Sequence, residues 1–449
     1  MTMRNDASKI DTSMFSKFHC TDAFYYFYLF VLCALFYVRD VHEVNVPLWV
    51  YLGFGFIGYS FFDYSQAVAF TAAMPLFNHG LQTNYIVIMA IVFYLIKYGA
   101  HMRINKIHGI VIFLMIFELL HSALEPFSLP EYFRYCVQYL YIALVIGESR
   151  IKDLLQRPTV VINTFIFIAA YFMLDVILVT LKYVSVEEMM REDFRFGFLG
   201  TYLSTKVGLY DNENMVALFA IVAIALLLVS AETSEKFRLL KVAFIVYFVY
   251  FGLMTGSKTF LLSIGIVILV YILYVLRRSI VKMLGVVTGI GLLLAIGANT
   301  VFKPLFDRVV ERFLADDITT GRASLFQQYN EYIFSDRRHF LFGIGLQGVE
   351  EKTGIDKAPH NGFQEVLLCW GIIGLVAIVV LLVCMVLHAK KYPNTKKFVN
   401  YIPLFIFLIF IQTIQFVRLS SIFGLLVVLY AAMLCGRGND EEKVLYSNG

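Results

Sequence analysis

Long apolar segments separated by shorter polar ones recur along the whole chain. Within each segment the apolar residues run continuously instead of alternating with polar ones, which favours helices over barrel strands. A helix needs roughly 20 such residues to cross a bilayer, and by this criterion the pattern predicts about 14 membrane-spanning helices, in a range of roughly 12–14. They lie near residues 22–38, 46–62, 65–79, 83–99, 107–124, 131–147, 159–183, 213–230, 239–256, 258–276, 280–302, 361–387, 398–416 and 419–435. The third is the least typical, because it is short and contains Asn78 and His79.

The pattern therefore predicts an all-α, polytopic membrane helical bundle with one large polar loop. The loop covers residues 303–360 and is the longest polar segment. It divides the chain into an N-terminal transmembrane bundle (1–183), a central transmembrane region (184–302), the loop itself (303–360), and C-terminal transmembrane helices with a polar tail (361–449). Within the loop, Leu325, Phe326, Tyr329, Tyr332 and Ile333 recur at helical spacing, so we expect amphipathic helices there.

Composition and charge agree with a membrane protein and indicate its orientation. Hydrophobic residues make up 59% of the chain and charged residues 16%, which excludes an ordinary soluble domain, and nothing indicates nucleic-acid binding. Short cytoplasmic loops of membrane proteins are enriched in Lys and Arg. With fourteen spans, the loops that carry such clusters all share the side of the N-terminal segment, and the clusters lie at residues 4–17, 97–106, 150–157, 236–241, 277–282 and 390–397. The 303–360 loop is then extracytoplasmic.

Polar residues inside the predicted helices are concentrated toward their outer ends. Ionisable residues within spans are costly and usually functional. Polar helix ends are also common without any function, but here the inner ends carry simple Lys/Arg clusters and the outer ends a different mixture. This distribution predicts a polar cavity near the outer boundary of the membrane, and the residues concerned are Glu118, His121, Asp175, Lys182, Asn212, Glu213, Asn214, Lys258, His360, Asn361, Gln364, Glu365, Gln412, Gln415 and Arg418.

The large loop contains residues suited to anion binding and proton transfer. It holds eight Lys/Arg and nine Asp/Glu, so an anion site must be built from individual side chains such as Arg322, whose planar guanidinium can donate two bonds to a phosphate. A helix that begins near Pro359 would add unpaired N–H groups. His360 at that helix start is the candidate for acid–base catalysis, although a lone histidine there is more often a structural cap. No metal-binding spacing or Walker loop occurs, so neither a metal nor another cofactor is expected.

Several short motifs around this loop resemble one known family. They are Thr320-Gly321-Arg322, Leu341 to Gly345 (LFGIG), His360-Asn361-Gly362-Phe363 and Gly371-Ile372-Ile373-Gly374, preceded by Arg195 to Gly200 (RFGFLG) with Asn212 and Asn214, and by Thr255-Gly256-Ser257-Lys258. In this order, over residues 185–390, they resemble the O-antigen ligase/polymerase superfamily. Its members are polytopic membrane glycosyltransferases that use undecaprenyl-pyrophosphate-linked saccharides on the outer face of the bacterial inner membrane. Lys258 departs from the pattern, because the family usually has arginine at this position.

The resemblance implies a large-loop glycosyltransferase fold and a role for each matching residue. The donor pyrophosphate would lie against Arg195, Lys258 and Arg322, which would stabilise the leaving group without a metal, and His360 would assist the acceptor hydroxyl. Further candidates for binding pyrophosphate or sugar are Asn214, Asn361, Arg337, Arg338 and Arg418. The partners would be the lipid-linked donor and acceptor and the bilayer, and a chain-length regulator would be a further one.

Four functions remain open on the sequence. The leading hypothesis is a polymerase that transfers a glycan of the O-antigen, capsule or exopolysaccharide type to the next lipid-linked repeat unit; we favour it because it serves a wider range of cell envelopes. A ligase would transfer the same glycan to lipid A core or another acceptor, and the motifs do not separate the two. A lipid-linked oligosaccharide flippase would need polar residues through the full membrane depth. A structural anchor whose outer loop binds a partner is a further alternative.

Overall fold

The protein is helical throughout the part of the chain that the structure describes. This computed structural model describes residues 21–77, 83–98, 106–123, 128–147, 157–189, 213–234, 236–276, 279–299, 322–390, 398–418 and 421–435, with positions 303, 304, 307, 310 and 311. Within these ranges there are no strands. The helices are α1 (Asp22–Asp40), α2 (Leu48–Phe61), α3 (Tyr64–Ala73), η2 (Met74–Phe77), α4 (Thr83–Tyr98), α5 (Lys106–Ala123), α6 (Leu129–Gly147), α8 (Pro158–Tyr183), α9 (Val186–Met189), α10 (Glu213–Thr233), α11 (Arg238–Met254), α12 (Lys258–Leu276), α13 (Ile280–Ala298), α15 (Arg322–Ser335), α16 (Arg337–Phe342), α17 (Val349–Thr353), α18 (Gly362–Lys390), η6 (Phe398–Tyr401), α19 (Ile402–Phe410) and α20 (Ser421–Leu434).

The all-α prediction is confirmed, and each of the fourteen predicted apolar segments overlaps one of these helices. Among the described residues, five helices are long and apolar enough to cross a membrane by length and composition: α1, α5, α8, α10 and α18. Several of the other helices are shorter. The ten residues of α3 rise only about 15 Å, roughly half the thickness of a hydrocarbon core. The protein is thus a membrane protein with several apolar helices, whereas the number of spans and the side on which the loop lies stay predictions.

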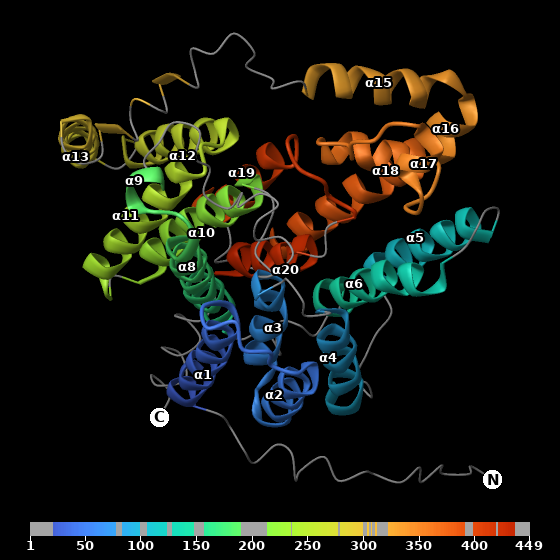
Figure 1. Ribbon diagram of the computed structural model, residues 1–449, viewed down its shortest axis with the longest axis horizontal. Coiled ribbons are helices and arrows are strands. Elements are labelled where there is room, and N and C mark those ends of the chain that lie inside the picture. Colours follow the sequence, from blue (N-terminus) through green and yellow to red (C-terminus); the bar gives the residue numbers. More distant parts are fainter. Residues whose placement is uncertain are drawn as a thin grey trace.

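α10 forms the centre of the bundle. Every residue from Asn214 to Val229 is buried, as expected for a helix that is apolar on all sides and surrounded by others. α8, α11, α12 and α19 pack around it. Figure 1 shows α1 to α4 at the bottom of the view, α19 and α20 near the middle, and α15 along the upper edge above α16 and α18.

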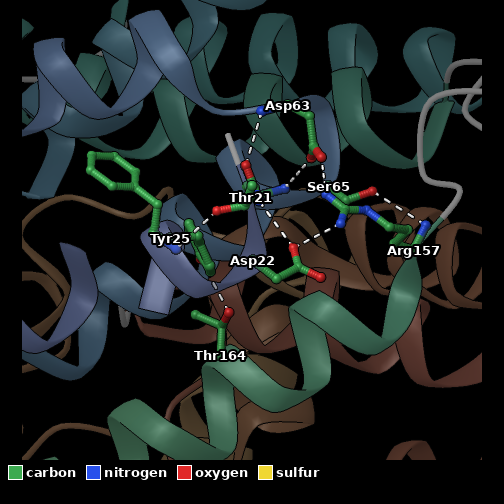
Figure 2. A network of polar contacts seen from close by, with 9 residues as sticks. Thr21, Asp22, Tyr25, Asp63, Ser65, Arg157 and Thr164 are labelled. Carbon is green, nitrogen blue, oxygen red and sulfur yellow. Dashed lines mark hydrogen bonds and ion pairs between the residues drawn. The ribbon is translucent and has the colours of Figure 1, made fainter. Parts of the chain in front are cut away.

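Polar contacts join the ends of α1, α3 and α8 at the two ends of the bundle. At the end far from the large loop, the Arg157 guanidinium, just before α8, bridges the carboxylates of Asp22 on α1 and Asp63 at the start of α3 (Figure 2). In the same network the Tyr25 and Thr164 hydroxyls lie 3.1 Å apart. At the other end, Lys182 near the end of α8 donates to Glu43, which follows α1. α1 and α8 therefore run parallel, so both helices begin at the same end of the bundle.

α18 is broken at Gly371, where the sequence pattern had predicted one continuous apolar helix. The backbone there has φ 62° and ψ −167°, a non-helical conformation that only glycine adopts readily. The break frees the carbonyls of Leu368 and Cys369 from the helix. They accept hydrogen bonds from the backbone N–H groups of Ile344 (3.0 Å) and Gly345 (2.8 Å), which follow α16.

Candidate functional site

A cavity of about 490 Å³ lies where α12, α15, the start of α18 and the turn after α19 meet. The bundle thus has a hollow at the end that carries the large loop, built from segments far apart in the sequence. The lining residues are Lys258, Thr259, Leu262, Arg322, Ala323, Leu325, Phe326, His360, Asn361, Gln364, Gln412 and Thr413.

Lys258 reaches the cavity from the first position of α12, and a tight turn sets its place. Gly256 in this turn has a φ of +61°, which favours glycine. The Ser257 hydroxyl caps α12 by accepting from Phe260 N–H (3.3 Å) and lies 2.8 Å from the Asn214 side-chain oxygen at the start of α10. The hydroxyl of Ser257, the residue before Lys258, therefore holds this turn against α10, the central helix.

Arg322 opens α15, and the buried face of this helix determines which way the other side chains point. Leu325, Tyr329 and Ile333 form that buried face, in agreement with the helical spacing predicted from the sequence. Phe326 was predicted to share it but is 44% exposed and lines the cavity instead. Gln364 on α18 donates to Phe326 O (2.7 Å) and to Asn330 Oδ1 (2.9 Å), which fixes α15 against the start of α18.

His360 and Asn361 lie just before α18, where the sequence predicted a helix start. The Asn361 side-chain oxygen accepts from Gln364 N–H (3.0 Å), and its amide donates to Gln412 Oε1 (3.0 Å). Asn361 therefore caps the helix and joins it to the turn after α19. Burial lowers the pKa of His360 below its usual 6.5, and the charge of Arg322 lowers it further, whereas Glu213 has the opposite effect. The imidazole is accordingly neutral at pH 7 and able to accept a proton.

A buried carboxylate fixes the turn that carries Gln412 and Thr413. Glu365 on α18 has no exposed surface, and its Oε2 accepts from the backbone N–H groups of Phe416 (2.5 Å) and Val417 (3.0 Å). These two hydrogen bonds join the turn after α19 to α18. This wall of the cavity is thus held by α18, the same helix that presents His360.

The loop segment 341–346 is locked to the break in α18 by close backbone packing. A side-chain carbon at Gly343 would lie 2.4 Å from the carbonyl carbon and oxygen of Cys369, and one at Gly371 would lie 2.3 Å from those of Leu341. The buried Glu118 carboxylate on α5 accepts from Leu346 N–H and from the Trp370 indole (2.7 Å). The glycines of the LFGIG and GIIG motifs therefore allow two backbones to touch, which fixes α16 on α18.

The other residues predicted from the sequence lie elsewhere. Arg195 is outside the described residues. Asn214 is buried beneath the turn that carries Lys258, so its position suits support of that turn. Arg337 and Arg338 are exposed on α16 and do not line the cavity. Arg418 does not line it either, because both of its terminal nitrogens donate to the Glu350 carboxylate (2.7 and 3.1 Å).

The structure adds cavity residues that the sequence prediction did not select as site residues. Gln364, Gln412 and Thr413 supply amide and hydroxyl groups, and Thr259 a further hydroxyl. Their signal was present in the sequence, since Gln364 and Gln412 belong to the polar residues at predicted outer helix ends. No cluster of three or more potential metal ligands occurs among the residues that the structure describes.

The comparisons with known proteins agree with the motifs. Residues 242–379 match a family model described as O-antigen ligase. No curated protein matches the chain. The matched segment includes Lys258, Arg322 and His360, and the sequence resemblance is thereby confirmed. Residues 242–379, about a third of the chain, therefore match the O-antigen ligase family model, which supports the resemblance to the O-antigen ligase/polymerase superfamily.

Proposed function

We propose that the protein is a membrane glycosyltransferase that polymerises polysaccharide repeat units. It would transfer a growing glycan from undecaprenyl pyrophosphate to a sugar hydroxyl of the next lipid-linked repeat, on the outer face of the bacterial inner membrane. The observation that carries this proposal is the cavity in which Lys258, Arg322 and His360 meet. These residues come from three distant segments. They supply two cations and one neutral imidazole, which are the groups that the reaction requires.

Lys258 and Arg322 would act on the leaving group. As the bond between the anomeric carbon and the pyrophosphate oxygen breaks, the bonding electron pair leaves with the pyrophosphate, whose negative charge increases. Cations that are already in place stabilise this charge at no further cost of reorganisation. Lys258 is held by the capped turn, and Arg322 by α15, whose position Gln364 fixes. The backbone of both cationic residues is thus held in place before the substrate binds.

His360 would act on the acceptor. The acceptor hydroxyl oxygen forms the new bond to the anomeric carbon, and its proton passes to the neutral imidazole. The lowered pKa of His360 keeps the imidazole neutral at pH 7, and the nearby Glu213 charge favours the imidazolium that results. The proton, the electron pair and the leaving group are all accounted for without a further reactant.

The remaining walls are suited to a sugar. Gln364, Gln412 and Thr413 carry amide and hydroxyl groups that can pair with sugar hydroxyls, while Leu262 and Phe326 are apolar. Several of these polar groups already bond to one another, as Asn361 does to Gln412. The cavity therefore combines an ordered polar wall with an apolar one, as expected for a carbohydrate attached to a lipid.

A reconstituted assay tests this function. The purified protein in vesicles receives a single lipid-linked repeat unit and no other acceptor, and the products are separated by size. A ladder of longer lipid-linked glycans is the expected result, and it should disappear in Arg322→Gln. Absence of any elongation, with the protein folded and correctly inserted, would contradict the polymerase.

The ligase is the second candidate, and the match to the O-antigen ligase family favours it. The same vesicles separate the two functions when lipid A core is added. Transfer to the core with no ladder in its absence identifies a ligase. Loss of that transfer in Arg322→Gln would show that the same cavity is used.

A further inference from the structure

Arg337 and Arg338, which the cavity does not use, belong to an exposed surface of mixed character. The α16 surface is defined here as Arg337, Arg338, Leu341 and Phe342 on α16 together with Phe334 near the end of α15. Phe334 is 63% exposed, Leu341 41% and Phe342 46%, and both arginines are exposed. Arg337 with Leu341 and Arg338 with Phe342 are four residues apart, so on α16 the charged and apolar side chains share one side of the helix.

The break in α18 indicates the depth of this surface. α18 has 29 residues and is about 43 Å long, which exceeds a hydrocarbon core by roughly 13 Å. The part after Gly371 is roughly 28 Å long and by itself matches the core. A membrane boundary at Gly371 therefore fits the length of the second half of α18. Leu341 lies against Gly371, because a side-chain carbon at Gly371 would be 2.3 Å from the Leu341 carbonyl.

α5 gives the same depth independently. It has 18 residues and is long and apolar enough to span the membrane. The chain that follows α16 meets its last turn, because Gly345 packs against His121 and Leu346 N–H donates to Glu118. At this level α5 still exposes Leu120, with 59% of its surface accessible. Two helices therefore place the end of α16 at one boundary of the bilayer.

The geometry points to a membrane anchor: the α16 surface inserts Phe334, Leu341 and Phe342 into the outer leaflet, while Arg337 and Arg338 bind the phosphates of anionic phospholipids. Aromatic residues and arginine are the side chains that suit the interface between hydrocarbon and headgroups. α16 is fixed to α18, and α15, which begins at Arg322, directly precedes α16. The anchor would therefore hold α15, which lines the cavity, at a set height above the bilayer. The inference does not depend on the transfer reaction.

Photocrosslinking of the full-length protein tests the insertion. The photoreactive residue p-benzoylphenylalanine replaces Phe342, or, as a matched control, the exposed Gln328 on α15. Both proteins are placed in nanodiscs of phosphatidylcholine with phosphatidylglycerol, irradiated and analysed by mass spectrometry. Lipid adducts should form at position 342 and be at least tenfold rarer at position 328. Equal yields at the two positions, or adducts at position 342 to a second copy of the protein, would overturn the anchor.

The headgroup preference is tested in the same discs. Each arginine near an anionic surface should favour an anionic neighbour by about fivefold. Adducts at position 342 should therefore be enriched in phosphatidylglycerol relative to its share of the disc. Enrichment should vanish in Arg337→Gln/Arg338→Gln and survive in Arg337→Lys/Arg338→Lys, which keeps the charge. Enrichment that persists in the glutamine variant would refute the phosphate contact.

Discussion

Gly343→Ala is expected to detach the large loop from α18, and the structure gives the size of the effect. Gly343 has φ 77° and ψ −165°, a combination that essentially only glycine adopts and that costs other residues about 1–3 kcal/mol. The added carbon would lie 2.4 Å from the Cys369 carbonyl. Because backbone atoms cannot swing away as a side chain does, the two segments must separate.

Separation also breaks the hydrogen bonds that join the segments. Ile344 N–H donates to Leu368 O and Gly345 N–H to Cys369 O, and each is worth about 1 kcal/mol net, or more where a buried carbonyl is left unpaired. The strain and the lost bonds together amount to roughly 3–5 kcal/mol. Since 1.4 kcal/mol is a factor of ten, the local opening constant should rise roughly 100- to 4,000-fold.

Hydrogen exchange measured by mass spectrometry reports this opening directly. The amides of residues 344–346 should be protected in the unaltered protein and exchange faster by that factor in Gly343→Ala. Transfer activity should also fall, because α15, which carries Arg322, is displaced together with α16 when the segments separate. The matched control is Gly354→Ala in the same loop. Gly354 also has a positive φ of 66°, but no atom lies within 4 Å of the added carbon, so only about 1–2 kcal/mol of local strain is expected.

Two outcomes would refute this reasoning. The amides of residues 344–346 could exchange as slowly in Gly343→Ala as in the unaltered protein, which would show that the contact with Cys369 is not what holds the loop. Alternatively, Gly354→Ala could accelerate the same amides equally, which would show that a positive φ anywhere in the loop is sufficient.

Three further predictions concern the cavity. Arg322→Gln should lower the initial transfer rate by roughly 100-fold or more, because it removes a preorganised charge from the leaving group, whereas Lys303→Gln, which removes an exposed cation of the same loop, should leave the rate within about twofold by the same reasoning. Lys258→Arg should keep most of the rate and Lys258→Gln should not, since only the former preserves the charge. The pH–rate profile should be level above pH 6.5 and fall at lower pH. The reason is that the lowered pKa of His360 lets its imidazole take up a proton only below that value. His360→Ala should remove this fall and lower the rate by about 100-fold or more.

Each of these predictions has an outcome that would count against it. Equal rates in Arg322→Gln and Lys303→Gln would exclude Arg322 from the reaction. Loss of activity in Lys258→Arg would speak against a pyrophosphate contact at that position. A pH–rate profile that still falls below pH 6.5 in His360→Ala would assign the titrating group to another residue.

Much of the site could be inferred from the chain alone. Arg322, His360 and Asn361 were selected from motifs and from their place at the edges of the polar loop, and Lys258 from its turn. The structure places all four in one cavity, while their chemical roles stay predictions. Arg337 and Arg418 show why the same reasoning goes no further. A sequence shows that an arginine is charged but not where its side chain points. Only the packed structure shows that Arg418 pairs with Glu350 and that Arg337 is exposed at the surface.

By itself the sequence determined the helices, because in hydrocarbon a continuous apolar segment must satisfy its backbone hydrogen bonds internally. It also determined the chemical types available at the loop and the family to which the motifs point. The break at Gly371 and the contact of Gly343 with Cys369 were decided only by the tertiary structure. Hydrophobic periodicity records which residues avoid water, but not which backbones approach within van der Waals distance. The place of the cavity follows from such approaches, so it emerged only when the segments were packed.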